Sequence, residues 1–175
     1  MKLRTQLVLI AAAYAAVLAA SAALIFARYM LYVTHPQDAA AAGGMFAAGD
    51  TFLALGIVCL LMVPTFFLAL VARQSENLSI LYSRSMLGLS LTAPLSAGLL
   101  AIPAIGQSSG ALGVLGMICL ERLFCAPIFI VAFVCSRLLA RYPRAKRLTL
   151  YALAIELLTL IVNVAWFFLP GPHRS

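Results

Sequence analysis

Charged residues are scarce in this chain, and acidic ones are the scarcest. Only 10% of the 175 residues are Asp, Glu, Lys or Arg, and just five residues are acidic. Soluble domains carry about 25% charged and about 45 to 50% apolar residues. Here 65% of the residues are hydrophobic and the mean hydropathy is +1.08. This composition excludes an ordinary soluble domain and predicts an integral membrane protein in contact with the lipid bilayer.

Residues that hold metals and cofactors are also few. The two histidines, His35 and His173, are expected near or beyond one membrane surface, so they offer no membrane pair to hold a haem. The four cysteines form no CxxC pair, and the sequence contains no HExxH, G-x-S-x-G or P-loop motif. We therefore predict no cofactor and no metal site. The sequence leaves enzymatic activity open and weighs against it.

Five apolar stretches are long enough to cross a bilayer. A helix needs about 18 to 20 predominantly apolar residues to span the roughly 30 Å hydrocarbon core. Such stretches run over 7–33, 51–72, 86–105, 111–139 and 148–169. We predict an all-α, polytopic transmembrane helix bundle of about five spans, forming one domain over 1–175. Prolines 64, 94 and 127 predict kinks in three of these helices.

Basic residues give the predicted orientation. Nine of the twelve lie in three short segments that alternate with loops carrying acidic residues or no charge: Lys2 and Arg4; Arg73 and Arg84; Arg137, Arg141, Arg144, Lys146 and Arg147. By the positive-inside rule these segments are cytoplasmic, which places the N-terminus inside and the C-terminus outside, in a bacterial inner membrane. Only Arg174 opposes this topology.

Two further interpretations of these features remain open. The net charge of +7 is explained by topology without nucleic acid, although the cluster at 137–147 would also suit anionic lipid headgroups, at about 1 kcal/mol per basic side chain. The first 23 residues resemble a secretory signal, but the apolar run continues to about residue 33, beyond the roughly 7 to 15 residues of a signal core. We therefore expect the first helix to be retained.

Glu121 and Arg122 stand side by side inside an apolar run. A charge at the bilayer centre costs about 2.5 to 3.5 kcal/mol on insertion scales, which makes such residues candidates for a functional site. Neighbours on a helix point about 100° apart, so each needs its own partner. From their depths we predict that Arg28 pairs with Glu121, and, as a second pair, that Arg122 reaches Asp50.

The last apolar stretch carries a polar stripe. Thr149, Glu156 and Asn163 recur every seven residues, with Thr159 near the same face, so this face should point into the protein. We expect no basic residue at the depth of Glu156, and such a carboxyl group would bind a proton readily, as proton-coupled carriers require. A second polar face, with Gly88, Thr92 and Ser96 four residues apart, is expected to meet it. A purely structural role for these groups stays open.

Three functions fit these features. The first is helix association, as a subunit of a membrane complex or as a homo-oligomer, because small residues such as Ala11, Ala15, Ala19 and Ala23 line one helix face. The second is transport or binding of a small solute or proton, through a pathway with these candidate residues: Glu156, Asn163, Thr159, Glu121, Arg122, Arg28 and Asp50. The third is an intramembrane lipid-modifying enzyme with Glu121 as acid and Arg122 as headgroup clamp.

Overall fold

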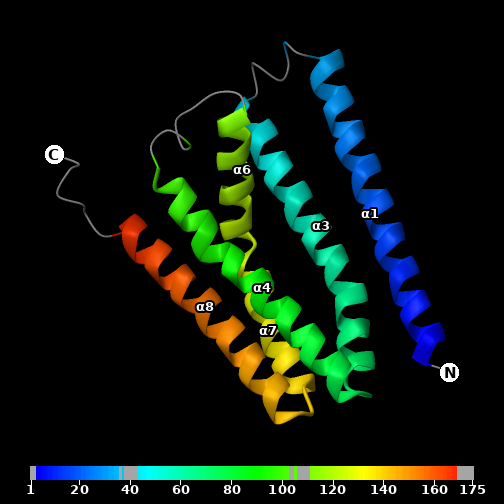
Figure 1. Cartoon of the computed structure of the whole chain (residues 1–175). Coiled ribbons are helices and arrows are strands. Elements are labelled where there is room, and N and C mark those ends of the chain that lie inside the picture. Colours follow the sequence, from blue (N-terminus) through cyan, green and yellow to red (C-terminus); the bar gives the residue numbers. More distant parts are fainter. Residues whose placement is uncertain (1–2, 36, 38–42, 103–104, 106–110, 169–175) are drawn as a thin grey trace. The chain divides into compact units, whose positions relative to one another are not determined.

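The computed structural model of the chain describes residues 3–35, 37, 43–102, 105 and 111–168 (Figure 1). Within these ranges the regular structure consists of six helices and no strand. The all-α prediction is therefore confirmed.

Two compact units divide the chain, Met1–Val71 and Ala72–Ser175. Unit 1 holds α1 (Leu3–Thr34) and nearly all of α3 (Gly43–Ala72). Unit 2 holds the other four helices: α4 (Glu76–Leu100), α6 (Ala111–Phe124), α7 (Ala126–Leu139) and α8 (Pro143–Phe168). The single domain expected from the sequence stays a prediction, and each unit is described by itself below.

Three helices among the described residues are long and apolar enough to cross a membrane: α1, residues 48–72 of α3, and α8 as far as Trp166. The α6 and α7 pair adds a fourth if its two bent parts form one span. Helix α4 does not meet these criteria; it begins at Glu76 rather than at residue 86, and serines interrupt its apolar sequence. The chain is thus a helical membrane protein with three to four candidate spans.

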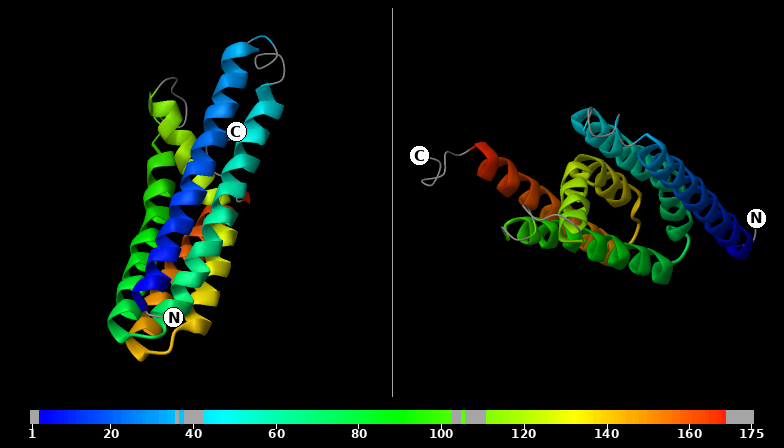
Figure 2. Two further views of the ribbon diagram at one scale, coloured as in Figure 1. Left: turned by 90° about the vertical axis from the view of Figure 1, so that its right-hand side faces the viewer. Right: turned by 90° about the horizontal axis from the view of Figure 1, so that it is seen from above.

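In unit 1, α1 and α3 run antiparallel and lie side by side (Figure 2). Alanine, the strongest helix former, dominates residues 11–23 of α1. The Tyr14 hydroxyl contacts Thr65 Oγ1 at 2.7 Å, and Thr65 donates its own hydrogen to the Leu61 carbonyl at 2.7 Å. Tyr14 is therefore the donor across the helix pair, and its side of α1 faces α3.

The three prolines do not act alike. Pro64 and Pro94 lie inside continuous helices, whereas the chain breaks at Cys125, two residues before Pro127, and α6 and α7 meet there at a bend of 48°. Proline has no N–H to donate to the carbonyl four residues earlier. After the break, the Ile128 and Phe129 amides both donate to the Cys125 carbonyl, at 3.0 and 3.2 Å, and so begin the hydrogen bonding of α7. The kink predicted at Pro127 is confirmed.

Helices α4 and α8 run parallel and form the most extensive helix pair of unit 2 (Figure 1). Their buried residues recur at alternating spacings of three and four: Ser79, Ser83, Met86, Ser90 and Ala93 on α4, and Ala145, Thr149, Ala152, Glu156 and Thr159 on α8. Small side chains of this kind allow close helix approach in lipid. The predicted seam therefore exists, but Gly88 lies outside it, exposed and with open space around it.

Candidate functional site: a buried ion pair in unit 2

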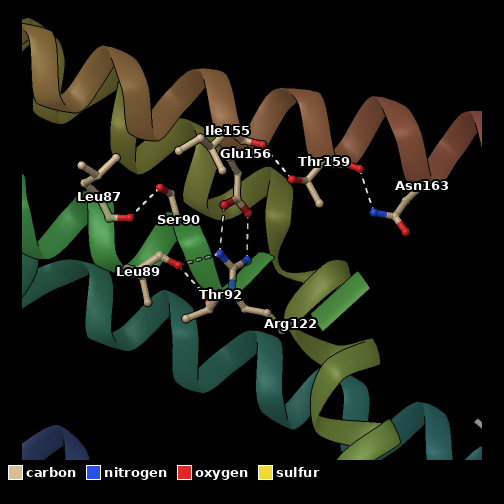
Figure 3. Close-up of polar contacts among 9 residues, drawn as sticks. All are labelled: Leu87, Leu89, Ser90, Thr92, Arg122, Ile155, Glu156, Thr159 and Asn163. Atoms are coloured by element: carbon tan, nitrogen blue, oxygen red, sulfur yellow. Dashed lines mark hydrogen bonds and ion pairs between the residues drawn. The ribbon is translucent and has the colours of Figure 1, made fainter. Parts of the chain in front are cut away.

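Arg122 lies in the last turn of α6, just before the break at Cys125. A cation is favoured at this end of a helix, because the unpaired carbonyls there carry partial negative charge. The break also turns α7 away from the axis of α6, and Arg122 extends from this corner toward α4 and α8 (Figure 3). The proline-induced bend thus positions the guanidinium group between two other helices.

The guanidinium group binds Glu156 of α8 in a two-pronged ion pair. Nη1 donates to Oε1 at 2.8 Å and Nη2 donates to Oε2 at 2.9 Å (Figure 3). Two parallel charge-assisted bonds are stronger and more directional than a single contact. The Glu156 side chain is 0% exposed and that of Arg122 is 12% exposed. The pair is therefore nearly sealed from the surroundings of the protein.

The remaining contacts of Arg122 tie the pair to two more helices. Nε donates to Thr92 Oγ1 of α4 at 2.8 Å, and Nη2 also donates to the Leu89 carbonyl at 3.3 Å. Thr92 orients its oxygen for this bond by donating its own hydrogen to the same carbonyl at 2.6 Å. On α7, the Phe129 ring lies 4.2 Å from the guanidinium carbon, a cation–π contact. One side chain therefore connects α4, α7 and α8 to the end of α6.

This geometry corrects one sequence-based expectation. Glu156 was expected to lack a basic partner, and this prediction is wrong, because the long Arg122 side chain reaches it from α6. The predicted pair between Arg122 and Asp50 would join the two units, and it stays a prediction. Within unit 1, Asp50 binds Arg28.

The other residues of the α8 stripe are turned inward as predicted, but they bond to their own helix. Thr159 Oγ1 donates to the Ile155 carbonyl at 2.8 Å, and Asn163 Nδ2 donates to the Thr159 carbonyl at 2.7 Å (Figure 3). Thr149, fully buried, donates to the Ala145 carbonyl at 3.0 Å. These groups lie on the face of Glu156 without bonding to it.

A second polar cluster lies in unit 1. Arg28 Nε donates to Asp50 Oδ1 at 2.7 Å, and the Tyr32 hydroxyl donates to Asp50 Oδ2. The Arg28 guanidinium also lies over the Tyr32 ring, 5.1 Å from its centre. A Cβ at Gly49 would stand 3.0 Å from Arg28 Nη2, so the missing side chain gives the guanidinium room beside Asp50. This cluster joins α1 to the start of α3.

The predicted site residues therefore fall into two groups. Arg28 and Asp50 meet in unit 1, whereas Arg122 and Glu156 meet in unit 2, with Thr159 and Asn163 along the same helix and half-buried Glu121 beside Arg122 in sequence. A pair between Arg28 and Glu121 would join the two units, and it stays a prediction.

Three residues that contact the arginines of the two clusters were not assigned to a site from the sequence. Tyr32 follows Arg28 by four residues, a spacing that returns a side chain to the same side of a helix, and this spacing is the signal that could have found it. Phe129 of α7 meets Arg122 of α6 across the bend at Cys125, so helical spacing could not have found that contact. Thr92 was expected to meet the last helix, but it binds Arg122 of α6 instead.

The chemistry available at the site is limited by these contacts. Four donor bonds of Arg122 go to Glu156, Thr92 and Leu89, which leaves one of the five guanidinium hydrogens for anything else. Within the described ranges, no group of three or more His, Cys, Asp or Glu residues is placed to hold a metal ion.

The chain matches no family model, no curated protein and no solved structure.

Proposed function

We propose that this small helical membrane protein acts by helix association, as a subunit of a membrane complex or as a homo-oligomer, and that α1 provides the contact surface. The observation that carries the proposal is an alanine face on α1 that remains exposed. Ala11, Ala15, Ala19 and Ala23 are all exposed, as are Ala12, Ala16 and Ala20 between them.

The position of these alanines on α1 supports the proposal. Tyr14 marks the side that bonds to α3. At about 100° per residue, Ala12, Ala16 and Ala23 lie roughly 160° to 180° around the helix from Tyr14. In lipid, where apolar burial gives helices little reason to associate, small residues drive association by letting two backbones approach closely. The alanine face is therefore suited to a second helix from outside this pair.

The association test uses bulky substitutions on the alanine face. Replacing Ala16 and Ala23 together by leucine should weaken association about tenfold or more, equivalent to about 1.4 kcal/mol, because the added side chains hold the partner helix away. Light scattering in mild detergent and cross-linking in membranes measure the oligomer or complex. Leu158→Phe, on an exposed site of α8, is the matched control and should change nothing. A wild-type protein that is monomeric and brings down no partner would disprove the proposal.

A second candidate is the transport or binding of a small solute or proton at the Arg122 and Glu156 pair. What favours it is the burial of both charges beside a broken helix, a setting found in carriers. Glu156→Gln should then abolish solute or proton flux in proteoliposomes in which the wild type is active. Unchanged flux in that variant would remove Glu156 from any transport mechanism.

A further inference from the structure

We propose that one end of unit 2 binds the phosphate headgroups of anionic membrane lipids. This end, called the basic end below, carries seven basic residues: Arg73, Arg84, Arg137, Arg141, Arg144, Lys146 and Arg147. All are exposed except Arg137, which is half-buried, and Glu76 is the one acidic residue within 73–84 and 137–147.

Five of the basic residues lie on α4, α7 and α8, which are joined by hydrogen bonds, and Arg73 and Arg141 lie in the short connections beside these helices. The Tyr82 hydroxyl of α4 and Ser136 Oγ of α7 lie 2.8 Å apart and share a buried hydrogen bond. Arg137 Nη1 of α7 donates to the Lys146 carbonyl of α8 at 3.3 Å. Only three residues connect α7 to α8. The positive charges are therefore held by rigid helix ends rather than by a flexible tail.

These charges have no counter-charge within the described part of the chain. None of the seven forms an ion pair there, and Glu76 is likewise without one. The first turn of α8 contains no acidic residue. Arg144, Lys146 and Arg147 are therefore repelled by the positive end of the helix dipole and by one another. An external anion relieves this repulsion, since the described residues place no carboxylate in an ion pair with these side chains.

The position of the basic end next to a candidate membrane span indicates that lipid headgroups are the anion. The candidate span on α8 starts at Pro143, and its basic residues precede an apolar run that begins at Leu148. Long basic side chains at such a position extend toward the headgroups while their methylene groups stay on apolar surface. Lipid phosphates are the anions at that level, and each basic side chain near an anionic membrane surface strengthens binding about fivefold.

The test measures lipid selectivity of the full chain in phosphatidylcholine vesicles. Spin-labelled phosphatidylglycerol and phosphatidylcholine are compared by the fraction of label immobilised at the protein. The wild type should prefer phosphatidylglycerol several-fold, and Arg144→Gln/Lys146→Gln/Arg147→Gln should bring this ratio close to one. Arg144→Lys/Arg147→Lys, which keeps the charge, should retain it. Accessibility of a C-terminal tag confirms that all variants insert with the same topology.

Two results would overturn the proposal. The first is a wild type that shows no preference for phosphatidylglycerol, or a triple glutamine variant that keeps it, because the basic end would then serve topology alone. The second is a preference abolished by inorganic phosphate but not by chloride at equal ionic strength, because a soluble anion would then be the ligand.

Discussion

A guanidinium group suits the position of Arg122 because its planar fork matches the two oxygens of Glu156 while Nε points elsewhere, to Thr92. A lysine ammonium has neither this shape nor this reach to several acceptors. Burial of both charges is costly, and the attraction between them offsets that cost only when the remaining donors and acceptors are also bonded. The four donor bonds of Arg122 meet this condition.

Breaking this pair from one side should destabilise unit 2 strongly. Glu156→Gln removes the negative charge but leaves the buried guanidinium, so we expect a loss of about 3 to 5 kcal/mol. Arg122→Met/Glu156→Met removes both charges and should be more stable than Glu156→Gln. Unfolding of the protein in bicelles gives the free energies. Equal or larger destabilisation in the double variant would contradict the interpretation of Arg122 and Glu156 as a mutually dependent pair.

The hydrogen bond to Thr92 should contribute less to the stability of unit 2 than the ion pair does. Thr92→Val keeps the shape of the side chain and removes the acceptor of the Nε bond, so we expect a loss of about 0.6 to 2 kcal/mol, in the range of interhelical hydrogen bonds in membranes. Ser85→Ala is the matched control, since exposed Ser85 bonds only to its own helix. The same unfolding measurement compares the two. A loss in Thr92→Val no larger than in Ser85→Ala would show that the Nε bond adds nothing.

At the scale of the helices, α6 is tightly confined at Gly116. A Cβ at Gly116 would stand 2.9 Å from the carbonyl oxygen of Ile105, a backbone atom that cannot rotate away. Gly116→Ala should therefore cost about 1 to 3 kcal/mol through overpacking. Gly88→Ala, with open space around it, should be neutral or slightly stabilising because alanine favours helices. Thermal unfolding of both variants tests this contrast, and similar midpoints would refute it.

The helices could be predicted from the sequence better than the contacts between them. Long apolar runs predicted α1, α3 and α8 because helix formation in lipid is decided locally, by backbone hydrogen bonding. The polar stripe of α8 likewise predicted its buried face. The partner of Glu156 could not be predicted, since it depends on which helices are adjacent and on the bend at Cys125. The sequence predicted that α4 begins at residue 86 rather than at Glu76, because its first turns are rich in serine rather than apolar.

At the scale of the whole molecule, both residues of the ion pair lie within unit 2. The partners of Arg122 described above, namely Leu89, Thr92, Phe129 and Glu156, all belong to Ala72–Ser175. We therefore expect Glu156→Gln to cost a fragment of residues 72–175 the same free energy, within about 0.5 kcal/mol, as it costs the full chain. Unfolding of the four proteins checks this. A smaller cost in the fragment would mean that residues 1–71 support the pair.

The pairing of α4 with α8 sets a condition on how the chain is made. Helix α4 is not apolar enough to count as a membrane span by itself, and its serine face packs against α8, which is synthesised after it. Until α8 has been synthesised, Glu156 does not exist and Arg122 has no counter-charge. Unit 2 can therefore reach its packed arrangement only after α8 has been synthesised.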